Sequence, residues 1–130
     1  MTENLGAVTA LIVFTLIHAV LGALQTALAA GAPFGRFVWG GNYRVLPASL
    51  RTASIVTIFV YALFVFIALE KAGATALLPA MVADVGIWVL AAYFLVGSVM
   101  NSLSRSKVER LTMAPCCLLL ATSSVLLALS

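Results

Sequence analysis

The sequence predicts an all-α protein, a bundle of four transmembrane helices that forms a single domain over residues 1–130. Hydrophobic residues make up 64% of the chain and charged residues only 8%, whereas roughly a quarter of the residues of a soluble domain are charged. Four apolar segments reach the roughly 20 residues that a helix needs to cross a hydrocarbon core. Barrel strands would be about 10 residues long with alternating polarity. The composition therefore excludes a soluble domain and favours a helical membrane protein.

The ends of the four predicted spans carry helix signals. Gly31 suits the residue after a helix C-terminus, and Pro79 lies near the start of the third span and suits the first turn of a helix. Ser106 and Glu109 match a capping box, which predicts that the fourth helix begins near Lys107, before it enters lipid. The predicted spans cover about residues 5–30, 50–69, 77–100 and 111–129.

Basic residues are concentrated in two connectors. Six of the seven Lys and Arg residues lie between the first and second spans or between the third and fourth, namely Arg36, Arg44, Arg51, Arg105, Lys107 and Arg110. By the positive-inside rule, these connectors are expected in the cytoplasm and both termini outside. The basic residues flank apolar segments instead of lining a polar face, so the net charge of +3 indicates contact with anionic lipid and not with nucleic acid. Such a bias also makes any homo-oligomer parallel.

A polar stripe runs along one face of the first span. Gln25 lies seven residues after His18, which brings it back to nearly the same direction on a helix, and Thr15 and Gly22 share that flank. Polar groups inside a membrane are costly and often functional, so one interpretation is a ligand or proton site around His18. The other is a neutral histidine that hydrogen-bonds a neighbouring helix and holds the bundle together.

The other spans carry further polar and aromatic candidates. Asp84 lies in the outer part of the third span, where it is placed either to approach His18 diagonally or to reach Lys71. Two rows at helical spacing favour contact between helices over catalysis: Ser54, Thr57, Tyr61 and Tyr93, Gly97, Asn101. No His/Cys/Asp cluster has metal-ligand spacing, so no metal or cofactor is predicted. The candidate ligand-binding residues are His18, Gln25, Asp84, Trp88, Tyr61 and Tyr93.

The connector between the first two spans predicts a short β-hairpin-like loop. Gly40 and Gly41 supply the positive φ angles of a tight turn, and aromatic or β-branched residues flank them, with Trp39 on one side and Tyr43 on the other. We expect this hairpin to cap the cytoplasmic mouth of the bundle. The alternative is an anchor whose aromatic side chains lie at the headgroup level.

Arginines of both cytoplasmic connectors form a candidate contact for a headgroup or other anion. The predicted start of the fourth helix adds serine hydroxyls and backbone N–H groups, which suit an anion. The alternative is that these residues only set the topology and meet ordinary anionic lipid. The residues are Arg36, Arg44, Arg51, Arg105 and Arg110.

Three stretches of these connectors carry a resemblance: residues 31–41 (GAPFGRFVWGG), 46–54 (LPASLRTAS) and 101–110 (NSLSRSKVER) with the following Ala-Pro. Here the chain resembles a group of small four-helix bacterial membrane proteins of unassigned function. The resemblance implies a multi-pass protein of the bacterial inner membrane. It implies no activity and no catalytic residue.

Three hypotheses for function follow from these features. The favoured one is a non-enzymatic membrane protein that binds a lipid, a small amphipathic molecule or another membrane protein. The second is a small transporter or channel that works as a parallel oligomer, with His18 as its protonatable group. The third is a membrane enzyme that uses His18 and Asp84 on a lipid-soluble substrate. It requires these side chains to come within hydrogen-bond reach, directly or through one water.

Overall fold

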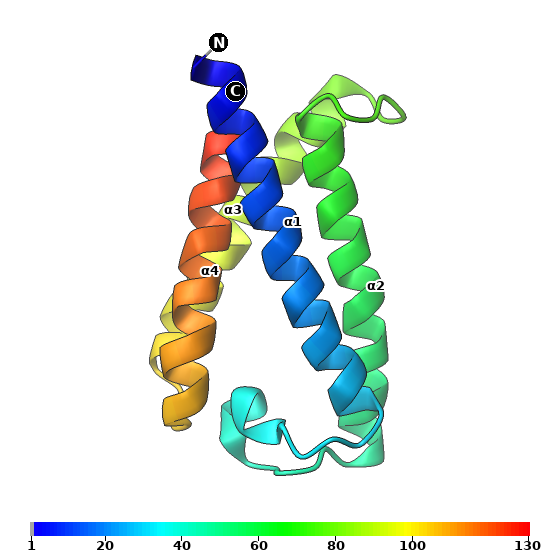
Figure 1. Cartoon of the computed structure of the whole chain (residues 1–130), viewed down its shortest axis with the longest axis vertical. Coiled ribbons are helices and arrows are strands. Elements are labelled where there is room, and N and C mark those ends of the chain that lie inside the picture. The colour runs from blue at the N-terminus through cyan, green and yellow to red at the C-terminus, as the bar shows by residue number, and fades with distance from the viewer. Residues whose placement is uncertain (1) are drawn as a thin grey trace.

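The computed structural model describes residues 2–130 and contains four long helices (Figure 1), which confirms the predicted all-α architecture. Each helix is long and apolar enough to cross a membrane. Both termini and the α2–α3 connector lie at one end, which we call the termini end, and the other two connectors lie at the opposite, loop end. The helices are α1 (Thr2–Ala29), α2 (Ala48–Lys71), α3 (Ala80–Ser102) and α4 (Lys107–Ala128).

The four helices form two closely packed pairs, α1 with α2 and α3 with α4. In Figure 1, α1 runs obliquely from the α4 side at the termini end to the α2 side at the loop end, and it packs against both helices. Contacts of α2 with α3 and α4 are fewer. The two pairs therefore meet both through the α1–α4 contact and through the contacts of α2 with α3 and α4, and α1 approaches α4 toward the termini end.

The core occupies the half of the bundle nearer the termini. Phe14 of α1 is fully buried, and its ring lies 5.8 Å from that of Phe94 on α3 in an edge-to-face arrangement. The other buried members of this cluster are Ala10, Ala68, Ile87, Leu90, Leu120, Ala121 and Leu127. Large apolar side chains are also exposed on the outside of the bundle, for example Leu16, Val20 and Phe59, which suits a lipid surrounding.

The connector of residues 30–47, which we call loop 1, is not a β-hairpin, and that prediction was wrong. Within residues 2–130 the structure has no strand, and loop 1 instead holds two 3₁₀ turns, Gly35–Phe37 and Trp39–Gly41. The positive φ angles expected at Gly40 and Gly41 are present, at 68° and 72°, but Trp39 also has a positive φ of 53°. Three successive left-handed residues continue the turn, so the flanking residues do not extend into paired strands.

Loop 1 is held against the start of α4. The Gly40 N–H donates to Oε2 of Glu109 at 3.1 Å, and the Ser106 hydroxyl donates to the Arg36 carbonyl at 2.5 Å. A Cβ on Gly41 would lie 2.7 Å from the Cβ of Ser106, so only glycine allows this close approach. The Arg36 carbonyl, which a hairpin would pair across its own strands, is therefore bound by α4, which is the second reason why no ladder forms.

Only one of the two hydrogen bonds of the predicted capping box is present at the start of α4. The helix begins at Lys107, and the Ser106 hydroxyl accepts the N–H of Glu109 at 3.2 Å. In a full capping box the Glu side chain would return to the Ser106 N–H, but that N–H donates to the Ser104 hydroxyl. The carboxylate of Glu109 is therefore available to bind loop 1.

Candidate functional site

A cavity of about 340 Å³ lies in the half of the bundle nearer the loop end. All four helices and loop 1 contribute to its wall, and Phe37, Val38 and Trp39 are the contributors from loop 1. Its volume falls in the usual range for small-molecule sites, about 300–1,000 Å³. Trp39 and Tyr93 line the cavity although each is more than half exposed. The cavity therefore reaches the surface of the protein at these residues.

The two rows of small polar and aromatic residues on α2 and α3 line this cavity, and Gly97 and Asn101 of the α3 row also contact α4, as predicted. Gln25 of α1 joins them, so three sequence candidates, Gln25, Tyr61 and Tyr93, share one site. The Thr57 hydroxyl donates to the Ala53 carbonyl of its own helix at 2.8 Å, which is the usual way a helix satisfies a threonine in lipid. The remaining polar groups of the wall are Ser54, Asn101, Glu109, Cys116 and Cys117.

Glu109 is the acidic residue of the cavity and was missed as a site residue by the sequence analysis. It is only 7% exposed, and its carboxylate combines the bond to Gly40 with a position in the cavity wall. One sequence signal was available, because cavity-lining residues follow it along α4 at offsets of four, seven and eleven: Met113, Cys116 and Leu120. That spacing defines one helix face.

The two cysteines are free thiols, and Cys117 accepts a hydrogen bond from the Asn101 amide at 3.4 Å. Packing between α3 and α4 is close here, since a Cβ on Gly97 would lie 3.3 Å from the Cys117 sulfur. Among the described residues, no group of three His, Cys, Asp or Glu side chains is arranged to hold a metal ion.

His18 lies on the side of the cavity nearer the termini end, surrounded by aromatic rings. Its ring centroid is 4.5 Å from that of Phe14 and 5.3 Å from that of Tyr61, with Phe64 and Phe94 at 6.0 and 5.7 Å. The side chain is 3% exposed, and Nδ1 bonds the Phe14 carbonyl of its own helix at 2.8 Å. This differs from the expected bond to a neighbouring helix. Nε2 is buried and has no hydrogen-bond partner among the described residues.

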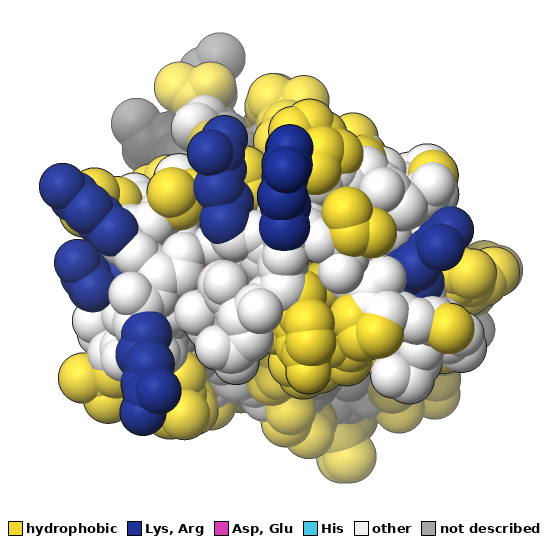
Figure 2. All heavy atoms as spheres, turned by 90° about the horizontal axis from the view of Figure 1, so that it is seen from below, with side chains coloured by type: hydrophobic (Ala, Val, Ile, Leu, Met, Phe, Trp, Pro, Cys, Tyr) yellow, Lys and Arg dark blue, Asp and Glu magenta, His cyan; other side chains and the backbone are white. Residues whose placement is uncertain are grey.

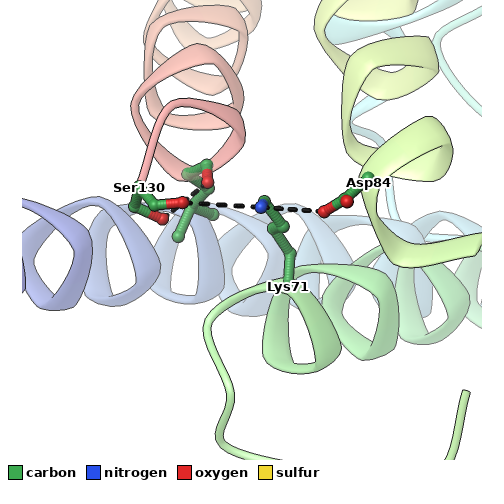
Figure 3. Close-up of polar contacts among 4 residues, drawn as sticks. Lys71, Asp84 and Ser130 are labelled. Carbon is green, nitrogen blue, oxygen red and sulfur yellow. Dashed lines mark hydrogen bonds and ion pairs between the residues drawn. The ribbon is translucent and has the colours of Figure 1, made fainter. Parts of the chain in front are cut away.

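Asp84 does not join His18. It forms an ion pair with Lys71 at 2.8 Å, and Lys71 Nζ also lies 3.5 Å from the carbonyl oxygen of Ser130 (Figure 3). The pair therefore connects α2, α3 and the end of α4 at the termini end. Of the two expected positions for Asp84, the one beside Lys71 is observed. Among the described residues His18 Nε2 has no hydrogen-bond partner, so His18 and Asp84 form no direct contact.

The Lys71–Asp84 ion pair is expected to contribute little to stability, because the Asp84 side chain is 54% exposed. Exposed ion pairs are usually worth at most about 1 kcal/mol. In a double-mutant cycle of Lys71→Gln and Asp84→Asn, we expect a coupling free energy below about 1 kcal/mol that falls with added salt. The measurement is the free energy of unfolding in mixed micelles. A coupling of about 3 kcal/mol would instead mark a pair that behaves as buried.

Trp88 also lies away from the cavity. It is 48% exposed and borders a shallow apolar groove on the outer surface between α3 and α4, together with Leu95, Leu118 and Leu126. Spacing along α3 placed Trp88 near Asp84, but helix spacing alone does not show which face turns inward. The structure therefore separates Trp88 from His18 and Gln25.

The loop end carries a basic face. Figure 2 shows Lys and Arg side chains spread over this end, with no Asp or Glu side chain visible in the view. Two of the five candidate arginines are engaged by backbone carbonyls: Arg51 Nε donates to Ala29 at 3.0 Å, and Arg110 donates to Ser104 at 3.1 Å. The Arg51 contact places a cation at the C-terminus of α1, where the helix dipole favours it. Arg36, Arg44 and Arg105 are exposed.

In comparisons with known proteins, no protein family, no curated protein and no solved structure matches this chain. The four apolar helices of the bundle are compatible with a multi-pass membrane protein.

Proposed function

We propose that this chain is a non-enzymatic membrane protein that binds a small amphipathic molecule or a lipid in the cavity near the loop end. The observation that carries the proposal is the cavity itself, whose wall combines all four helices with loop 1. Its lining is mainly apolar and aromatic, with a few hydroxyl, amide and carboxyl groups. Such a mixture is typical of sites that bind an apolar body and orient one polar group.

The structure of loop 1 supports a binding role. Loop 1 is ordered by two contacts with α4, and it uses Phe37, Val38 and Trp39 to form part of the cavity wall. Trp39 adopts a left-handed conformation that is uncommon for a bulky residue. Strained conformations of this kind are found preferentially at functional sites.

The basic face supports a proposed orientation of the cavity relative to the membrane. By the positive-inside rule, we propose that the loop end faces the cytoplasm of a bacterial inner membrane, with both termini outside. The cavity then lies in the cytoplasmic half of the bilayer, next to the anionic headgroups that exposed Arg36, Arg44 and Arg105 attract. A molecule that partitions into the bilayer would reach it from the membrane or along the headgroup layer.

Filling the cavity tests the proposal. Thr57 lies in the cavity wall, and a phenylalanine there would occupy part of the space. We expect Thr57→Phe to remove most of any lipid or small molecule that native mass spectrometry finds on the gently extracted wild-type protein. Because a cavity of this size holds one small molecule, partial filling is expected to lower occupancy about tenfold or more.

The matched control is Val56→Phe, since valine and threonine have nearly the same shape and Val56 is 56% exposed on the same turn of α2. This variant is expected to retain the bound molecule at the wild-type level. If wild-type protein carries no bound molecule under any extraction condition, or if both variants retain it equally, the proposed cavity function is wrong.

A further inference from the structure

We propose that the polar group recognised in the cavity is a positively charged ammonium, carried on an apolar or aromatic body, and that Glu109 is its counter-ion. This inference rests on the proposed cavity function and specifies the chemical class of the ligand. It follows from three features that the described residues 2–130 give the cavity wall: an unpaired buried carboxylate, several aromatic rings and the lack of any basic lining residue.

The first feature is the unpaired charge of Glu109. Among the described side chains, no Lys, Arg or His nitrogen lies within 4.0 Å of this carboxylate. Oε2 accepts the Gly40 N–H, whereas Oε1 accepts no hydrogen bond from the described residues and is not fully enclosed, and Glu109 lines the cavity. Buried charges are normally paired. Glu109 lies in the first turn of α4, where the partial positive charge of the helix N-terminus compensates only part of the carboxylate charge.

A comparison with Glu70 shows which hydrogen-bond donors Glu109 lacks. Glu70 is buried to a similar degree, at 8% exposure, but both of its oxygens are satisfied. Oε1 accepts the Thr75 hydroxyl at 2.9 Å and the Leu77 N–H at 2.8 Å, and Oε2 accepts the Leu78 N–H at 3.2 Å. Glu70 is therefore a complete structural carboxylate that closes the α2–α3 connector. Glu109 lacks the equivalent donors on Oε1.

The second feature is the aromatic lining. Faces of Trp and Tyr rings attract ammonium groups, and the attraction grows when water is excluded. Rings from three separate parts of the fold meet around the cavity: Trp39 and Phe37 from loop 1, Tyr61 from α2, and Tyr93 and Phe94 from α3. A carboxylate beside several rings is the arrangement that favours an organic cation over a neutral or anionic molecule.

The third feature is the distribution of basic residues. None of the seven Lys and Arg residues lines the cavity, although six of them lie at the same end of the bundle, in the connectors or the adjoining helix ends. An anionic headgroup is therefore favoured on the outer basic face, where Arg36, Arg44 and Arg105 are exposed. Inside the cavity, Glu109 is the charged residue of the wall, which favours a cation there.

Trp39 provides a direct readout of occupancy. The chain has two tryptophans, and Trp88 lies on the outer α3–α4 groove, so Trp88→Phe leaves Trp39 as the single reporter. In nonionic detergent, this protein is titrated with benzyltrimethylammonium, with neopentylbenzene as its uncharged isostere, and with benzylsulfonate as an anion. We expect the ammonium to change Trp39 emission with at least about tenfold higher affinity than either other probe.

The charge is then removed from Glu109 without changing its shape. Glu109→Gln keeps an oxygen that accepts the Gly40 N–H, and it is expected to lower ammonium affinity about tenfold or more while leaving that of neopentylbenzene unchanged. Glu70→Gln is the matched control, because it neutralises the other buried carboxylate at the far end of the bundle. We expect ammonium affinity in this control to equal that of wild type.

Several results would overturn the inference. One is equal affinity of the wild-type protein for benzyltrimethylammonium and neopentylbenzene, which decides the question even if Glu109→Gln does not fold. Another is an unchanged ammonium affinity in folded Glu109→Gln. If all three probes bind alike and Thr57→Phe blocks them, the cavity function stands and only the charge preference is wrong. If no probe affects Trp39 and Thr57→Phe matches wild type in native mass spectrometry, both proposals fail.

The ammonium has two possible sources, a free amphipathic amine or the headgroup of a lipid. Competition in the same titration separates them. Displacement of benzyltrimethylammonium by dihexanoylphosphatidylcholine, but not by dihexanoylphosphatidylglycerol, identifies a lipid headgroup. If neither lipid displaces the probe, the ligand class is a free amphipathic ammonium. Equal displacement by both lipids would contradict recognition of the ammonium.

Discussion

Replacing Gly35 with alanine is expected to detach loop 1 from the bundle. A Cβ at this position would lie 1.8 Å from the Tyr43 carbonyl oxygen and 2.9 Å from that of Arg44. Both oxygens belong to the backbone, so no side-chain rotation relieves the clash. The Gly35 N–H also donates to the Arg44 carbonyl at 2.9 Å, which is the bond that closes loop 1 across its base. We expect a local loss of about 3 kcal/mol or more, the upper end for overpacking.

Hydrogen exchange measures this loss where it occurs. Peptides that cover residues 31–47 are expected to exchange on the order of a hundredfold faster in Gly35→Ala than in wild type. Peptides from α3 are expected to remain protected, because that helix does not depend on loop 1 for its backbone bonds. Gly22→Ala is the matched control, since a Cβ there meets nothing within 4 Å. Wild-type exchange of residues 31–47 in Gly35→Ala would contradict the close approach of Gly35 and Tyr43.

Replacing Phe14 with alanine is expected to cause the largest loss of stability in the core. Phe14 is 0% exposed and packs against the rings of His18 and Phe94. In lipid the separated helices are already in an apolar medium, so the transfer part of the usual core penalty is largely absent. The void still removes dispersion contacts with the surrounding rings. We therefore expect a loss of about 2 kcal/mol, below the range for water-soluble cores.

The matched control is Phe59→Ala, which removes the same side chain from a position that is 72% exposed. Its expected effect is within about 0.5 kcal/mol of zero, as for other surface changes. The measurement is equilibrium unfolding by sodium dodecyl sulfate in mixed micelles, followed by far-UV circular dichroism. Equal losses in the two variants would show that interior packing is not what holds the helices together.

One of the two reasons why the hairpin prediction for loop 1 failed lies outside the loop. Positive φ angles at Gly40 and Gly41 were predicted correctly. The sequence did not show that Ser106 and Glu109, about 70 residues away, would bind the backbone of the same loop. A local turn signal describes the turn and not the partners of its flanking groups. Those partners decide whether the flanks become strands.

The candidate site likewise combines residues that the sequence predicted with residues whose placement only the structure shows. Gln25, Tyr61 and Tyr93 were selected as polar or aromatic residues inside predicted spans, and the structure brings them to one cavity. Trp88 was selected on the same grounds and lies on an outer groove. Glu109 was assigned to a helix cap, although its carboxylate faces loop 1 and the cavity. Helical spacing groups residues by face, but it does not show which face of each helix packs against the other helices.

The sequence by itself determined the class of protein, the four helices and their approximate ends. These features depend on local properties: the length of apolar segments, the capping residues at Ser106 and the turn-forming glycines. Only the tertiary structure decided that loop 1 binds α4, that Asp84 pairs with Lys71, and that the half near the loop end holds a cavity. Almost every face of these helices is apolar, and lipid and protein interior are similar solvents for such faces. The choice of inward face therefore depends on close packing and on a few polar contacts between distant residues.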